Sequence, residues 1–153
     1  MQHEAVEEHA QALFDGIAAA VPGWVERCVE RRLLDYQGAA DDEVMSAAAG
    51  AGRRAQTEVA ASLRALLETD IDSQGTTPLS LLRQAVRYPT EVLRAAGIPP
   101  VRRDAFAESS FPDDDYDLAP ASLADVDPDL VELGLAWGAA KAMAHRRRHG
   151  GGR

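Results

Sequence analysis

Residues 41–68 read DDEVMSAAAGAGRRAQTEVAASLRALLE, and this stretch decides the fold class. Its apolar and small side chains recur every three or four residues, which is the spacing of one face of an α-helix. These side chains are Val44, Ala48, Ala51, Ala55, Val59, Ser62, Leu63 and Leu66. Asp41 or Asp42 suits the N-cap, because a carboxylate accepts hydrogen bonds from the first free backbone N–H groups. The stretch therefore predicts one long amphipathic helix that ends near Glu68.

The first half of this helix is rich in alanine and glycine between Ala47 and Gly52. Small side chains let a neighbouring helix approach closely, whereas each Gly weakens a helix by about 1 kcal/mol relative to Ala. The pattern leaves two questions open. The helix could bend or break near Gly50–Gly52, and the neighbour could be a helix of the same chain or a second copy of the protein.

Helix periodicity also precedes this stretch. Residues 4–20 carry a single apolar stripe, and Pro22 and Gly23 punctuate it. Because Pro is well tolerated in the first turn of a helix, we expect a new helix to start at Pro22. This second helix should run to about Tyr36, with Trp24 and Cys28 on its inward apolar stripe and Gly38 as its C-terminal stop.

Two more helices are expected after the long one. Thr77 is a suitable N-cap before a helix that ends at Gly97, and Pro89 inside it predicts a kink or a split. The last helix opens at Asp127-Pro128-Asp129, where acidic residues complement the positive end of the helix dipole. Arg146–Arg148 lie near its negative end.

Residues 98–127 are predicted to be irregular, because four prolines disfavour long elements there. Single turns are expected over 102–109 and 122–125. Apolar anchors, among them Phe106, Phe111 and Tyr116, would let the segment pack across a helical body. The predicted fold is therefore all-α: a bundle of four to five helices with an irregular, Pro- and Asp-rich segment across it. We expect one domain over residues 1–149, with halves at 1–70 and 76–149, and a flexible tail at 150–153.

Composition bounds the cellular setting. Cys28 is the sole cysteine among 153 residues, so an internal disulfide is impossible and a reducing compartment fits best. The N-terminus carries Glu4 where a signal peptide needs basic residues, and no apolar run approaches the ~20 residues of a membrane span. We therefore expect a cytoplasmic protein.

Charge is the second compositional constraint. The formal net charge of −9 disfavours duplex DNA and anionic membranes as main partners, because both repel an acidic protein. The charge is unevenly placed: residues 104–132 hold ten acidic residues and no basic one, whereas residues 141–153 hold five basic residues and no acidic one. The acidic segment is expected to fold onto basic neighbours or onto a basic partner.

One motif is suggestive of metal chemistry. The run Asp113-Asp114-Asp115-Tyr116-Asp117 matches the DDxxD pattern, in which carboxylates hold Mg²⁺ against a diphosphate. Here the run lies between two prolines instead of on a long helix, and no second acidic motif accompanies it. Asp113, Asp114 and Asp117 are therefore weak metal candidates, and the favoured interpretation is a solvated or Arg-paired acidic loop. Cys28 is interpreted as a packing residue, and no cofactor is predicted.

Several stretches, mainly within residues 76–141, resemble a known group of sequences. They are TPLSLLRQAVRYPTEVL (77–93), GIPPV (97–101), FPDDDYDLAPAS (111–122) and GLAWGAAKA (134–142). Together they resemble a conserved hypothetical family of actinobacteria. That family carries no assigned activity, so the resemblance implies no functional residue.

The sequence favours a small, non-enzymatic regulatory or adaptor protein that binds another protein. The expected interaction surface combines basic and aromatic side chains: Arg83, Arg87, Tyr88, Arg102, Arg103, Phe111, Tyr116 and Trp137. Two alternatives stay open. One is a sensor of anionic small molecules with a pocket between the bundle and residues 98–127, and the other is a Mg²⁺-dependent enzyme on phosphorylated substrates.

Overall fold

The computed structural model describes residues 2–68, 77–101 and 114–150, and side chains over 5–68, 77–101 and 114–146. Its helices are α1 (Gln2–Gln37), α2 (Asp42–Glu68), α3 (Pro78–Gln84), α4 (Arg87–Ala95), α5 (Leu123–Val126) and α6 (Leu130–Gly150). The described residues contain no strand, which confirms the predicted all-α fold. None of the described helices has both the length and the apolar character needed to cross a membrane.

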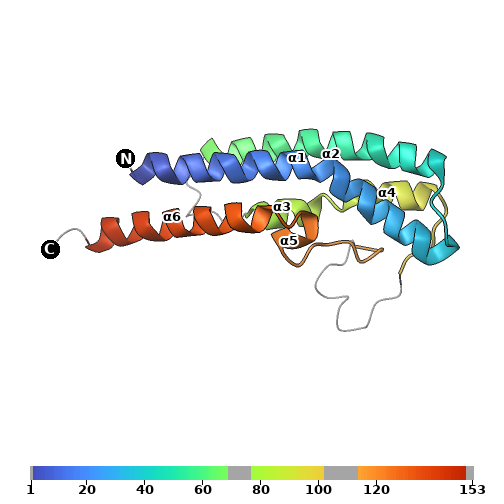
Figure 1. Cartoon of the computed structure of the whole chain (residues 1–153). Helices are drawn as coiled ribbons and strands as arrows, with labels where there is room; N and C mark the ends of the chain where they lie inside the picture. Colours follow the sequence, from blue (N-terminus) through green and yellow to red (C-terminus); the bar gives the residue numbers. More distant parts are fainter. Residues whose placement is uncertain (1, 69–76, 102–113, 151–153) are drawn as a thin grey trace.

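Helix α1 is the centre of the arrangement (Figure 1). Helix α2 returns antiparallel along α1, and α6 lies along the first half of α1 on another side. Helix α4 packs against both α1 and α2. The core between these helices is built from aliphatic side chains of α1, such as Leu13, Ile17, Val25 and Leu33, which are fully buried.

The structure corrects the prediction of two helices before residue 38. Helix α1 is continuous through Pro22, with a bend near its middle (Figure 1). Pro22 has no N–H, so the carbonyl of Ala18 one turn earlier loses its usual donor. The side-chain amide of Gln56 on α2 donates to that carbonyl at 2.8 Å. The helix therefore continues because a neighbouring helix replaces the missing hydrogen bond.

Helix α2 approaches α1 most closely at the same point. A Cβ atom added to Gly52 would lie 3.0 Å from both Cα and the carbonyl oxygen of Pro22. The alanine- and glycine-rich face, with Ala48, Ala51 and Ala55, is buried there. This face of α2 thus meets α1 of its own chain, and α2 runs through Gly50–Gly52 without a break.

The link between Pro22 and Gln56 makes a double-mutant prediction. Gln56→Ala should lower the free energy of unfolding by about 1–2 kcal/mol, because the Ala18 carbonyl loses its donor. In a Pro22→Ala background residue 22 has an N–H again, so Gln56→Ala should cost less than about half as much. Urea unfolding of the four proteins measures the coupling, and fully additive effects would contradict the assignment.

Helix α2 and helix α3 both begin at the N-caps that the sequence predicts. The Asp41 carboxylate accepts from the N–H groups of Glu43 and Val44 at 2.9 and 3.1 Å. Thr77 and Ser80 form a reciprocal capping box at the start of α3. Both caps satisfy donors that would otherwise lack intrahelical partners.

The predicted kink or split at Pro89 is a split between α3 and α4. Pro89 cannot donate to the carbonyl of Ala85, and the N–H of Tyr88 takes that acceptor at 3.1 Å instead. This tightened turn separates the two short helices. Gly97, at a φ of 77°, ends α4, and the N–H of Ile98 closes the end on the carbonyl of Leu93 at 3.0 Å.

The irregular segment is described in part. Residues 114–122 carry no helix, and α5 is the single turn expected near 122–125. Tyr116, Leu118 and Val126 from this part of the chain are buried in the core. The other single turn, expected over 102–109, lies outside the described residues.

Candidate functional site

The described structure holds an open pocket of about 560 Å³ between the second half of α1 and the chain around α5. We call it the α1 pocket. The residues that line it come from two segments: Trp24, Arg27, Cys28, Glu30, Arg31 and Leu34 from α1, and Asp117, Leu118, Ala119, Pro120, Ala121 and Asp125 from the facing chain.

The α1 wall follows from helix geometry. Trp24, Cys28 and Arg31 are three or four residues apart, so they share one face of α1 in the half that follows the bend. Trp24 and Cys28 are buried and form the apolar floor, whereas Arg31 is exposed at the rim. Leu34 continues the wall with 46 % of its surface exposed.

The facing wall is a loop held by a buried carboxylate. Asp114 is 2 % exposed, and its two oxygen atoms accept from the backbone N–H groups of Leu118 and Ala119, both at 2.7 Å. Asp117 has a φ of 54°, a left-handed conformation that Asp tolerates better than most residues. Asp114 therefore fixes the tight turn that presents residues 117–121 to the pocket.

Long-range hydrogen bonds with α1, α3 and the chain after α4 hold this loop in place. The Arg32 guanidinium on α1 donates to the carbonyl of Tyr116 at 2.8 Å. Arg83 on α3 donates to the carbonyl of Pro120 at 3.0 Å. The Tyr116 hydroxyl, which is buried, donates to the carbonyl of Ile98 at 2.7 Å. The pocket thus lies between α1 and a loop that hydrogen bonds from α1 and α3 hold in place.

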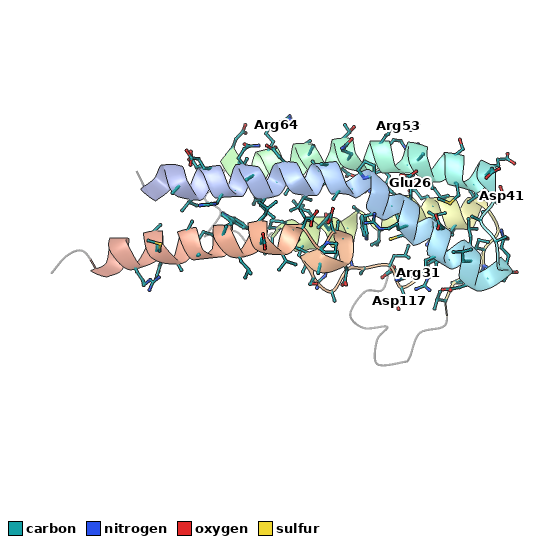
Figure 2. All side chains as sticks on the ribbon, in the orientation of Figure 1. Glu26, Arg31, Asp41, Arg53, Arg64 and Asp117 are labelled. Carbon is teal, nitrogen blue, oxygen red and sulfur yellow. The ribbon has the colours of Figure 1, made fainter. Side chains whose placement is uncertain are left out.

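Charges of both signs surround the pocket. Arg31 and Asp117 lie on the same side of α1, away from Arg53 and Arg64 on the outer face of α2 (Figure 2). Glu30 and Asp125 add two more carboxylates to the lining. Arg27 also lines the pocket, and its guanidinium donates to the carbonyl of Val126.

The Cys28 thiol in the floor of the pocket stays protonated at neutral pH. Burial raises the pKa of Cys28 from 9.0 to about 11, because the thiolate would lose its hydration, and the positive charges of Arg31 and Arg27 oppose this only in part. A thiol with so high a pKa is a poor nucleophile near pH 7. The packing role expected for Cys28 agrees with this environment.

The raised pKa of Cys28 predicts an alkaline loss of stability. In the unfolded chain the thiol ionises near pH 9, whereas in the folded chain it holds its proton to about pH 11. Over that window the unfolded state binds fewer protons, so the free energy of unfolding should fall by roughly 1.4 kcal/mol per pH unit. Urea unfolding at several pH values should show a steeper fall in the wild type than in Cys28→Ala, in which the raised pKa values of Tyr88 and Tyr116 leave a smaller slope. Equal slopes in the two proteins would contradict the burial of the thiol.

The basic and aromatic residues expected at an interaction surface do not form one exposed patch among the described residues. Arg87 and Tyr88 both contact Glu58 on α2, and the hydrogen bond from Tyr88 holds the pKa of Glu58 below its usual value. Arg94 pairs with Asp115, as the favoured interpretation of an Arg-paired acidic loop expects for that residue. Arg83 supports the pocket wall from outside. Arg102, Arg103 and Phe111 lie outside the described residues.

Two of the expected surface residues are instead core residues. Tyr116 is 1 % exposed and anchors the loop beneath the pocket. Trp137 is buried against Phe14 of α1 in an edge-to-face pair, with ring centroids 5.5 Å apart. The ammonium group of Lys141 lies 3.5 Å from the centre of the Trp137 ring. Burying a large aromatic ring stabilises the fold, so Tyr116 and Trp137 lie in the core. The prediction that both belong to an exposed interaction surface is wrong.

The weak metal candidates are used differently in the described structure. Both oxygens of Asp114 accept backbone N–H groups, and Asp117 lies in the lining of the pocket. Asp113 is outside the described residues. Within the described part of the chain, no three His, Cys, Asp or Glu side chains are grouped as a metal site would require.

Sequence reasoning missed the α1 wall of the pocket as a site. It assigned Trp24 and Cys28 to the core stripe and gave Arg27, Arg31 and Leu34 no role. A usable signal was present, because Arg27 and Arg31 are spaced i, i+4 beside that stripe and Leu34 falls off it.

The fold and the pocket together define a small all-α protein with an open, mixed-charge pocket on its central helix. Comparison of the chain with protein-family models, with curated proteins and with solved structures finds no match. The resemblance of residues 76–141 to an actinobacterial family therefore stays a prediction.

Proposed function

We propose that the protein is a small, non-enzymatic regulatory or adaptor protein that binds a segment of another protein in the α1 pocket. The observation that carries the proposal is the combination of an apolar floor with a rim of both charge signs. Trp24 and Leu118 are 3 % and 4 % exposed and line the floor of the pocket, whereas Leu34 beside them is 46 % exposed and supplies apolar surface for a partner's anchor side chain. A polypeptide supplies apolar, acidic and basic groups together, as such a lining requires.

The chemistry of the partner segment follows from the rim. Arg31 suits an acidic side chain of the partner, and Asp117 with Glu30 suits a basic one. A large apolar side chain between them would fill the floor beside Trp24. Anchors of this kind carry most of the binding free energy in protein interfaces, while rim charges set orientation.

The experiment is affinity capture from native lysate with four proteins, followed by mass spectrometry. We expect the wild type and Arg64→Glu, a control on the outer face of α2, to capture the same partner in stoichiometric amount. Leu34→Asp and Arg31→Glu should reduce that capture by about tenfold or more. Circular dichroism should show the same helicity in all four proteins. Equal capture by all four would exclude the α1 pocket as the binding site.

A sensor of anionic small molecules is the second candidate, because Arg27 and Arg31 share one wall of the pocket. It is less favoured, since three carboxylates in the lining oppose an anion. Mass spectrometry of small molecules retained by the purified protein separates the candidates. A retained acidic metabolite that Arg31→Glu no longer holds would favour the sensor.

We also propose a cytoplasmic location, in keeping with the single buried thiol.

A further inference from the structure

The outer face of α6 carries apolar side chains that no described part of the chain covers. Helix α6 packs against α1 and α5 through Leu130 and Trp137. On the opposite face Val131, Leu135 and Met143 are 41 %, 68 % and 49 % exposed. They are three of the five large apolar side chains exposed in the described structure, so exposed apolar surface is concentrated on this helix.

The sequence of this outer face is complementary to itself. Glu132, Leu135, Ala139, Met143 and Arg146 fall within about 80° of one another around α6 at 100° per residue. Glu132 and Arg146 are equidistant from Ala139, and Leu135 and Met143 are equidistant from it too. If a second copy of the helix runs in the opposite direction with its Ala139 at the same level, each acidic residue of the face lies opposite a basic one and each large apolar residue lies opposite the other.

We propose that α6 pairs with α6 of a second copy of this chain, antiparallel, about a two-fold axis that passes beside Ala139. In that arrangement Leu135 of each copy faces Met143 of the other, and Glu132 of each faces Arg146 of the other. An isologous interface makes every contact twice, so the two charge pairs flank two apolar pairs. Ala139 at the axis has a small side chain, which lets the two helices approach closely.

The charge of the surrounding chain favours the same orientation. Acidic residues gather at the start of α6, where Asp127 and Asp129 precede Glu132, and basic residues gather from Lys141 to its end. An antiparallel pair brings the acidic start of each helix to the basic end of the other, whereas a parallel pair would bring like charges together. This complementarity is the reason to name a second copy of the chain as the occupant.

Charge exchange tests the pairing directly. Sedimentation velocity should show a monomer–dimer equilibrium of the wild type between about 1 and 200 µM, as expected for an interface of modest size. Glu132→Arg and Arg146→Glu should each weaken dimerisation by about tenfold, because each creates two like-charge contacts. The double exchange Glu132→Arg/Arg146→Glu should restore it, and Leu135→Asp should leave a monomer.

The control is Arg53→Glu, which changes an exposed Arg on the outer face of α2 (Figure 2) and should dimerise like the wild type. Circular dichroism establishes that each variant is folded. A wild type that stays monomeric throughout, or a double exchange that dimerises no better than either single variant, would overturn the proposal.

Discussion

Gly52→Ala is expected to lower the free energy of unfolding by about 1–3 kcal/mol, although alanine is the better helix former. The added methyl group would lie 3.0 Å from the Cα and carbonyl oxygen of Pro22. Both are backbone atoms of α1, so they cannot move away from the added methyl group unless α1 and α2 move apart. Urea unfolding monitored by circular dichroism measures the loss.

Gly50→Ala is the matched control, two residues earlier in the same helix. Its Cβ would meet only the ends of the Arg54 and Arg53 side chains, at 3.5 and 3.7 Å. Both side chains can move, so the gain in helix propensity should dominate and raise stability by up to about 1 kcal/mol. If both glycine replacements stabilised the protein equally, the close contact of α2 with Pro22 would be wrong.

Asp114→Ala is expected to cost about 2–4 kcal/mol of stability. The change removes the acceptor of two backbone N–H groups in a buried turn, and each unpaired buried donor carries a desolvation penalty. Asp115→Ala is the control on the neighbouring residue. It breaks an exposed ion pair with Arg94, so the free energy of unfolding should stay close to that of the wild type.

The same pair of variants connects stability to the α1 pocket. Asp114 holds the turn that forms one wall, so Asp114→Ala should also reduce partner capture at temperatures where the protein stays folded. Asp115→Ala should leave capture unchanged. A stable, fully binding Asp114→Ala protein would show that the turn does not depend on this carboxylate.

Periodicity and caps predicted most of the fold. The stripe from Val44 to Leu66 and the caps at Asp41 and Thr77 are local signals, and local signals act within a turn or two of the helix. Pro22 was misjudged because its compensation comes from Gln56, on a different helix. No rule that considers neighbours in sequence can anticipate that hydrogen bond.

The candidate site was harder to predict for a related reason. The pocket exists because the loop of Tyr116 and Asp117 lies against α1, where Arg32 holds it by a hydrogen bond across 84 residues of sequence. Aromatic residues in a Pro- and Asp-rich stretch suggested an exposed binding surface. Tyr116 and Trp137 are instead buried by long-range packing, which composition does not reveal.

The bend in α1 also constrains how this protein can change over generations. Pro22 removes a donor, Gln56 replaces it, and Gly52 leaves room for the bent backbone. A lineage that lost Pro22 would release both α2 positions from their constraint, whereas a lineage that kept it would be held to glycine at position 52 and to an amide at position 56. Substitutions at the three sites should therefore occur together in descendants, and the order in which they arise should begin with the proline.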